Sequence, residues 1–321
     1  MKSTLFFLSL VVFSKFSVAQ TCDPDNKYDK IVSGYHSSVA QTSTGALVGW
    51  GQDMQVNGTG DVLVPQLINS TNYPAIGSST PLLASIGGGN SSSTQQAVLL
   101  TTDGLYAWGN TGGIFSTTLR SAASMAKLAD AITSDNTFRL PNIGGVNVTP
   151  DSVKMLVAAF QTLAILTKGG RVYVLSQVTN AAIRGAGAIA TPSATTWYQV
   201  QTSAGNPLLN VTAIRLQVSD ATHNAFIALT SNGSVFTWGS STFLGNNTAV
   251  ASRNFATQMT LPAEFNSTNI PAMIAVTGGI SSSAATNNTY FLLSKSGALY
   301  SLGDNSQRQC GTFATTATYT Q

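Results

Sequence analysis

The sequence predicts an all-β protein built from repeated four-stranded units, the organisation of a β-propeller. Three observations indicate this fold. Glycines that mark turns recur at nearly constant intervals, the segments around them alternate apolar and polar residues, and only 8 % of the residues are charged although Ser, Thr and Asn are frequent. With 43 % hydrophobic residues, the 321-residue chain can bury a large core and does not have the composition of a disordered protein.

The N-terminus has the pattern of a secretory signal peptide. Lys2 precedes an apolar run from Leu5 to Phe13, and the small residues Ser17 and Ala19 stand where a signal peptidase would recognise them. The pattern leaves an N-terminal membrane anchor open as the alternative, and no membrane span is expected after signal cleavage. The chain is therefore predicted to be secreted, into an extracellular or periplasmic space. The expected division is a signal peptide at 1–19, an N-terminal segment at 20–30 and propeller repeats at 31–321, incomplete at the C-terminus.

Five segments have the pattern of a β-hairpin with a glycine in the turn. In the clearest, Asn232-Gly233 can supply the positive-φ residues of a tight turn between strands that contain Leu229 and Trp238. The hairpins are expected at about 39–51, 98–110, 164–176, 227–239 and 291–303. Their turn glycines are Gly45, Gly104, Gly170, Gly233 and Gly297, which are 59, 66, 63 and 64 residues apart. Such regular spacing indicates a repeat architecture.

Each period contains more than the hairpin. A short apolar segment that ends in small residues precedes it, and a polar loop follows it, leading to a Pro or an aromatic residue beside an apolar one, as in Pro65-Gln66-Leu67. One period therefore holds about four short strands. This is the content of a propeller blade, a small antiparallel sheet that packs face to face against its neighbours.

Four segments carry a more specific motif. They are Gly-x-His-Ser at 34–37, Asp-Gly followed by Trp-Gly at 103–110, an alternating strand that ends in Trp-Gly at 235–239, and a Gly- and Gln-containing loop at 303–311. Over about residues 30–311 this combination resembles the repeat of the regulator of chromosome condensation family. The resemblance implies about five recognisable blades of the seven that usually close the ring in that family. The third copy departs from the motif, because Gln161 and Leu175-Ser176 replace the His and the Trp-Gly.

The resemblance also assigns structural roles. They are expected for the turn glycines named above and for Trp50, Trp108, Trp238, His36 and His223. A metal pair or a catalytic base is the other interpretation of the two histidines. However, equivalent positions in different blades lie far apart around a ring, so one metal ion could hardly join them.

No pattern predicts a catalytic, cofactor-binding or metal-binding site. The carboxylates are scattered, and none of the common nucleophile, zinc or phosphate-loop motifs is present. Asp23, Asp25 and Asp29 have the alternate spacing of a calcium loop, but the segment lacks its central Gly and closing Glu and contains Lys27. A solvated N-terminal segment is therefore the preferred interpretation.

The two cysteines leave two interpretations open. In an oxidising compartment, Cys22 and Cys310 could form a disulfide that ties the N-terminal segment to the last hairpin. Alternatively, Cys310 is a small buried apolar residue, because it stands where the repeat loop usually has Leu.

The charge balance argues against nucleic acid as a partner. Loss of Lys2 and Lys15 with the signal peptide lowers the formal net charge from +3 to +1, and no cluster of Lys and Arg is present. The loops are rich in Ser, Thr, Asn and Gly, and Trp197, Tyr198 and Phe243 are candidate aromatics of a binding face. Trp197 and Tyr198 could equally be packing residues of their blade.

The sequence therefore predicts a secreted, non-catalytic interaction module whose loop faces bind a protein or a glycan. An extracellular enzyme on a propeller scaffold, such as a lyase or a glycosidase, is one alternative, and it would need ionisable residues gathered at the central axis. The N-terminal region of a larger surface or adhesion protein is the other.

Overall fold

The computed structural model describes residues 31–34, 36–58, 60–88, 95–117, 120, 122–128, 140–218, 224–240, 244–245, 252–278, 288–305, 308–311 and 316–320. The predicted signal peptide and N-terminal segment lie outside these residues, as do Cys22, His223 and Phe243. No helix in the described part has the length and the apolar character needed to cross a membrane.

Within the described residues, the chain forms five four-stranded antiparallel sheets, each with its strands in chain order, so the predicted fold class is confirmed. We call these sheets blades 1 to 5. Their strands are β1 (Ile31–Ser33), β2 (Ser37–Gln41), β3 (Leu47–Gly51) and β4 (Val62–Leu67) in blade 1; β5 (Pro81–Gly87), β6 (Gln96–Thr101), β7 (Gly104–Gly109) and β8 (Ala126–Lys127) in blade 2; β11 (Val153–Ala159), β12 (Thr162–Thr167), β13 (Val172–Ser176) and β14 (Tyr198–Gln199) in blade 3; β17 (Val211–Val218), β18 (Asn224–Thr230), β19 (Val235–Ser240) and β20 (Arg253–Gln258) in blade 4; and β21 (Pro271–Gly278), β22 (Asn288–Ser294), β23 (Leu299–Gly303) and β24 (Thr316–Thr320) in blade 5.

Short elements lie in the connections between these strands. The two-stranded ribbons β9 (Asn142–Ile143) with β10 (Val146–Asn147) and β15 (Gln201–Ser203) with β16 (Asn206–Pro207) lie between successive blades. The 3-10 helices are η1 (Pro74–Ile76), η4 (Pro150–Ser152) and η5 (Ala181–Arg184).

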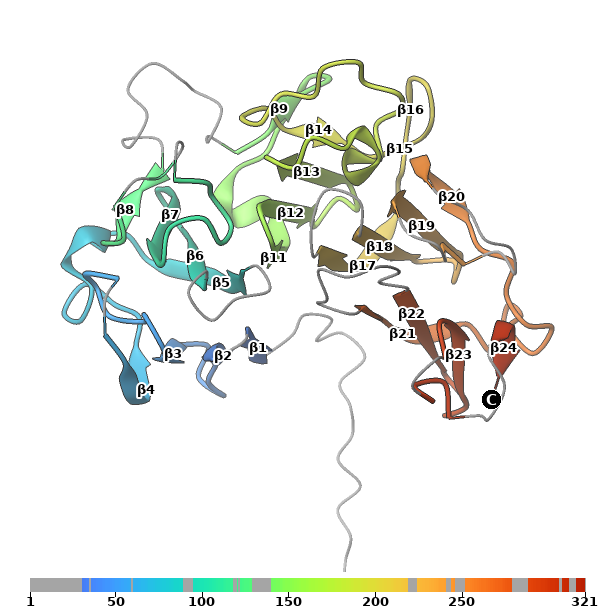
Figure 1. Cartoon of the computed structure of the whole chain (residues 1–321), viewed down its shortest axis with the longest axis horizontal. Coiled ribbons are helices and arrows are strands. Elements are labelled where there is room, and N and C mark those ends of the chain that lie inside the picture. Colours follow the sequence, from blue (N-terminus) through green and yellow to red (C-terminus); the bar gives the residue numbers. More distant parts are fainter. Residues whose placement is uncertain are drawn as a thin grey trace, which may run out of the picture.

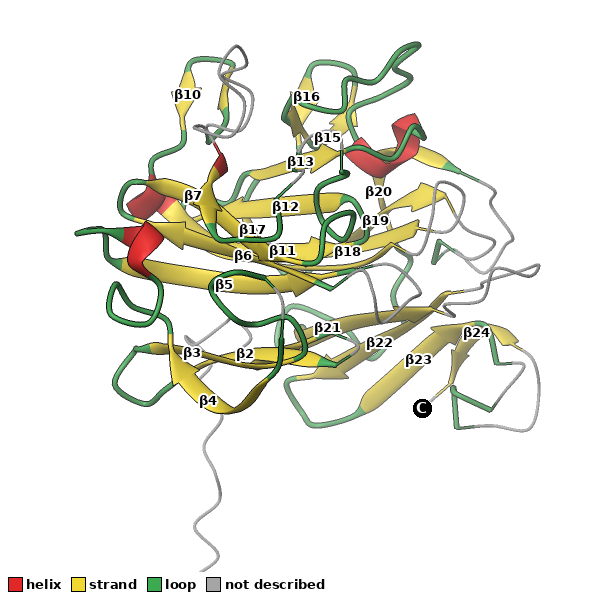
Figure 2. Ribbon diagram, turned by 60° about the vertical axis from the view of Figure 1, so that its left-hand side comes forward, coloured by secondary structure: helices red, strands yellow, loops and turns green. Residues whose placement is uncertain are grey.

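The blades follow one another in chain order around an arc (Figure 1). The first strands of the blades line its inner side, where β5 packs against β11, β11 against β17, and β17 against β21. Blades 1 and 5 stand at the two ends of the arc. Figure 2 shows the sheets stacked in layers, so that each inner blade covers one face of each neighbour.

The hairpin turns have a different geometry from the tight turn expected at Asn232-Gly233. Only Gly233 has a positive φ, of 85°. The N–H of Gly233 donates to the carbonyl of Thr230, and the N–H of Thr230 donates to the carbonyl of Ser234. The loop therefore has three residues and needs one left-handed residue, its glycine. Blades 1, 3 and 5 repeat these two hydrogen bonds, whereas the blade 2 hairpin is one residue shorter.

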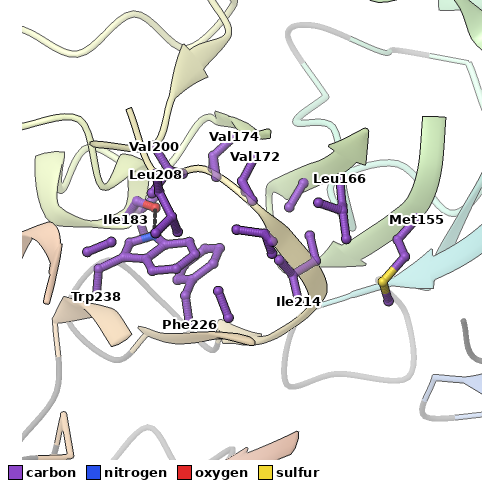
Figure 3. Close-up of a cluster of buried hydrophobic side chains, with 14 of the residues drawn as sticks. Met155, Leu166, Val172, Val174, Ile183, Val200, Leu208, Ile214, Phe226 and Trp238 are labelled. Carbon is purple, nitrogen blue, oxygen red and sulfur yellow. Dashed lines mark hydrogen bonds between the residues drawn. The ribbon is translucent and has the colours of Figure 1, made fainter. Parts of the chain in front are cut away.

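Four clusters of buried apolar side chains form the core, one between each pair of successive blades. The cluster between blades 3 and 4 is drawn in Figure 3. There Trp238 of β19 stacks on Phe226, with 5.0 Å between ring centroids, and its Nε1 donates to the Ile183 carbonyl at 3.2 Å. Trp108 of β7 likewise donates from Nε1 to the Met54 carbonyl of blade 1, at 3.3 Å. The tryptophan thus joins its blade to the loop between the third and fourth strands of the preceding one.

The glycine after this tryptophan has its own physical reason. Gly239 has a φ of 122°, and a Cβ atom there would lie 2.4 Å from the Asn224 carbonyl oxygen of the neighbouring strand. A side chain at this position would force the two strands apart. In the Trp-Gly pair, the tryptophan therefore joins two blades, and the glycine allows two strands of one blade to approach closely.

Candidate functional site

The outer strand of blade 1 exposes several apolar side chains close together. In β4, Leu63 is 89 % exposed and Val64 is 70 % exposed, and Leu67 is exposed as well. Val56, in the preceding loop, is a fourth exposed apolar residue. Because β4 is the last strand in the order β1-β2-β3-β4, it lies at the outer edge of the sheet. Contiguous exposed apolar residues on an edge strand mark an interaction surface.

A bulge in β4 causes this exposure. The pairs Gly49–Gln66 and Gly51–Val62 enclose one residue of β3, Trp50, but three residues of β4. These three residues, Leu63 to Pro65, must therefore arch away from the ladder. Pro65 has no N–H to donate, which suits a position outside the hydrogen-bonded ladder.

Blade 4 has the same bulge, and there the chain itself covers it. The pairs Thr237–Thr257 and Gly239–Arg253 again enclose one residue of β19 and three residues of β20. A segment that follows η5 runs alongside: Ala186 forms an antiparallel bridge with Phe255, and the N–H of Gly187 donates to the Asn254 carbonyl at 2.8 Å. Phe255 is the counterpart of Val64. The position that an extended segment covers in blade 4 is thus exposed in blade 1.

The covering segment needs small residues. A Cβ atom on Gly187 would lie 2.9 Å from the Phe255 ring, and the φ of Gly187 is 100°. A larger residue at this position would push the segment off the Phe255 ring. Val64, the counterpart in blade 1, has no ring, so the close approach that requires a glycine is specific to blade 4.

An open groove of about 520 Å³ runs beside the β4 bulge. Its lining residues are Gln55, Val56, Asp61, Val62, Val64, Pro65, Gln66 and Asn72, of which Asp61 is the one that carries a charge. Burial is the main cause that raises the pKa of Asp53 above its ordinary value, and the nearby carboxylate of Asp61 raises it further. Two acidic groups thus lie close together at this end of blade 1, so a basic group of a ligand would be favoured there.

Comparison with known proteins places the fold. No protein-family model matches the chain, and no curated protein matches it either. Among solved structures, yeast RCC1 (Prp20) bound to Kap60 aligns with a TM-score of 0.54 at 17 % identity. The Prp20p structure from Saccharomyces cerevisiae, described with its binding properties to Gsp1p and histones, aligns with a TM-score of 0.54 at 13 % identity.

The fold is that of an RCC1-type β-propeller. The alignments cover 86 % and 90 % of this chain. They cover 56 % and 62 % of the two yeast chains, so this chain spans less than two thirds of either structure.

The repeat residues of this RCC1-type propeller differ in their surroundings. All five turn glycines have positive φ, and Trp108 and Trp238 are completely buried. Trp50, at the same position in blade 1, is only half-buried. His36 is exposed in the loop between β1 and β2, where its Nδ1 lies 2.9 Å from Oε1 of Gln52. His223, its predicted counterpart, lies outside the described residues.

Of the two interpretations of Trp197, binding and packing, the structure supports packing. Trp197 is buried in the cluster between blades 2 and 3 and is therefore a packing residue. Tyr198 is half-buried: the guanidinium of Arg184 lies 5.3 Å from its ring centroid, and its hydroxyl accepts a hydrogen bond from the Ser193 N–H. Phe243, the third predicted aromatic, lies outside the described residues.

Cys310 is buried and forms no disulfide among the described residues, and burial raises the pKa of its thiol. The predicted partner, Cys22, is outside the described residues, so the disulfide stays a prediction. Among the described residues, no three His, Cys, Asp or Glu side chains gather as metal ligands. A cavity of about 60 Å³ between the first three strands of blade 1, β5 and β11 has a lining of mainly aliphatic residues without an ionisable side chain.

Sequence reasoning missed the β4 surface, although one signal was available. Val62, Leu63 and Val64 are consecutive apolar residues in a strand whose repeat predicts alternation. Such a run fits a strand buried on both faces as well as a bulge that exposes it. Only the register with β3 decides between the two.

Proposed function

We propose that this protein is an exported, non-catalytic interaction module that binds an extended segment of another protein along the β4 bulge of blade 1. The observation that carries the proposal is the contrast between β4 and β20. The same bulge is covered by Ala186 and Gly187 in blade 4 and exposes Leu63 and Val64 in blade 1. The yeast structures with the same fold support a binding role in general, because one is bound to Kap60 and the other is described as binding Gsp1p and histones.

The surface also indicates the class of ligand. Main-chain pairing along an edge strand suits an extended polypeptide, with side-chain pockets adding specificity. The groove has aliphatic residues and one carboxylate among its described lining residues, and it offers no aromatic ring on which a sugar could stack. We therefore propose a protein segment in preference to a glycan. The segment should pack an apolar residue against Leu63 and Val64 and place a basic residue near Asp61.

Selection of displayed peptides would test this site. Short random peptides on phage are selected against the wild-type protein and against a double variant, Leu63→Ser with Val64→Ser, which removes the apolar side chains without adding charge. We expect peptides with an apolar residue and a neighbouring Lys or Arg to be enriched on the wild type and lost on the double variant. The control is Leu209→Ser, which alters an exposed leucine elsewhere on the surface and should retain these peptides. Selected peptides that bind the double variant equally well would refute the proposed site.

Export is proposed on the N-terminal pattern alone. N-terminal sequencing of the protein recovered outside its native cells should start at Gln20. Protein that stays in the cells with residues 1–19 intact would contradict this part of the proposal.

A further inference from the structure

In blades 1 to 4, one face of each sheet packs against the next blade. The corresponding face of blade 5 has no neighbour among the described residues. Leu299 stands two residues after the turn glycine and is 54 % exposed. Its counterparts in the other four blades are all buried in the cluster shared with the next blade. These counterparts are Leu47, Leu105, Val172 and Val235.

A second position, occupied by methionine in two blades, gives the same result. Met273 in β21 pairs with Leu293, just as Met155 in β11 pairs with Leu166. Met155 is 2 % exposed in the cluster between blades 3 and 4, whereas Met273 is 55 % exposed. We call Met273, Leu293 and Leu299, together with the half-buried Phe291, the front face of blade 5.

The opposite end of the arc carries the complementary half of this contact. In blades 2 and 4, Trp108 and Trp238 pack against the preceding blade and are fully buried. Their counterpart in blade 1, Trp50, is half-buried, and so are its neighbours on the same side of the sheet. We call Ser38, Ala40, Val48 and Trp50 the back face of blade 1, because these residues pair with one another across β2 and β3.

The two faces match each other in chemistry. Neither contains a charged residue. Inside the molecule, a front face packs against a back face four times, once between each pair of successive blades. Figure 1 places blades 1 and 5 at the two ends of the arc. The chain thus carries both halves of a contact that it already makes four times.

We propose that copies of this protein associate head to tail, with the front face of blade 5 of one copy packed against the back face of blade 1 of the next. The contact is heterologous, because two different surfaces meet. Such contacts build a ring if the rotation between copies closes and an open chain of copies if it does not. Burial of the apolar residues on both faces would provide the driving force, as it does between blades within the molecule.

Variants that disable one face each, and their mixture, would test the head-to-tail arrangement. Leu299→Asp disables the front face and Val48→Lys disables the back face. Sedimentation velocity should show that the wild-type mass rises with protein concentration and that each variant alone stays monomeric. A one-to-one mixture should regain association but stop at a dimer, because Val48→Lys still has a front face and Leu299→Asp still has a back face. A second pair, Met273→Glu and Ala40→Lys, guards against a variant that fails to fold.

Each other outcome would overturn the proposal. A wild type that stays monomeric at every concentration would show that the two faces do not meet between copies. A single variant that still dimerises alone would show that like faces meet. The Leu299→Asp variant, whose substitution lies on blade 5, should still bind the peptides selected on the wild type. Its behaviour separates a failure of this inference from a failure of the proposed function.

Discussion

Trp50 and Trp238 occupy the same position of the repeat, yet their environments differ. Trp238 lies between blades 3 and 4, is fully buried, and donates a hydrogen bond to Ile183 of the preceding blade. Trp50 lies in blade 1, at the end of the arc, and is half-buried. The stability that a repeat residue provides therefore depends on whether a neighbouring blade covers it, as nearest-neighbour models of repeat proteins describe.

The largest expected difference is between the two tryptophans. Trp238→Ala should lower the free energy of unfolding by about 3–5 kcal/mol, because it removes a buried ring and leaves a cavity. Trp50→Ala should lower it by only about 1 kcal/mol, since its half-buried ring contributes less burial. Urea unfolding of both variants at low protein concentration measures the two values. Equal losses would show that Trp50 is covered in solution and would remove the contrast between the inner and terminal blades.

The two methionines allow the same comparison without a change of residue type. Met155→Ala should lower the free energy of unfolding by about 2–5 kcal/mol, the usual range for a buried methionine. Met273→Ala should change it by less than about 0.5 kcal/mol, as is usual for exposed positions. Thermal unfolding at two protein concentrations checks both. If Met273→Ala loses stability only at the higher concentration, its face is covered by a second copy.

The sequence predicts this fold well because its evidence is local and repeated. The five Gly turns and the three Trp-Gly pairs are short motifs with a direct physical cause, and the similar spacing of the turns excludes coincidence. Even blades 3 and 5, which lack Trp-Gly, fold as the others do. Leu175 fills the tryptophan position in blade 3 and is buried between blades 2 and 3, and Leu302 fills it in blade 5 and is buried between blades 4 and 5.

The candidate site could not be predicted in the same way. The exposure of Leu63 depends on the pairing register between β3 and β4. The covering of Phe255 depends on a segment about 70 residues earlier in the chain. The burial of Trp197 depends on the position of blade 2. None of these long-range relations leaves a local pattern in one sequence.

A smaller difference is expected between two turn glycines. Gly170 has a φ of 74°, and a Cβ atom there would lie 2.9 Å from backbone atoms of Asn210 and Val211. Gly297 has a φ of 91°, and a Cβ atom added there would have no other atom within 4 Å. Both Gly→Ala variants should lose about 1–2 kcal/mol from the left-handed backbone, and Gly170→Ala about 1–3 kcal/mol more from the steric clash. Thermal unfolding measures the difference, and equal losses would contradict the close approach at Gly170.

The smallest effect is expected at an ion pair outside the contacts between blades. Lys127 of β8 forms an ion pair with Asp103 in the blade 2 turn. A hydrogen bond from Lys127 is the main cause of the lowered pKa of the Asp103 carboxyl. A lowered pKa in the folded state stabilises the protein above the ordinary pKa of Asp, near 3.9, and this contribution disappears as the pH falls through the folded-state value. Because the Asp103 side chain is 40 % exposed, solvent screening limits the contribution to about 0–1 kcal/mol.

Lys127→Ala should therefore lower stability slightly at pH 7, and this loss should become smaller at pH 2, because the contribution disappears as the pH falls through the folded-state pKa of Asp103. Chemical unfolding at the two pH values, with Lys295→Ala in the blade 5 turn as a control, measures this difference. A loss at pH 7 as large as that of Met155→Ala would mean that a surface ion pair matters as much as a contact between blades. The distinction between covered and uncovered repeat positions would then no longer explain where the stability of this propeller resides.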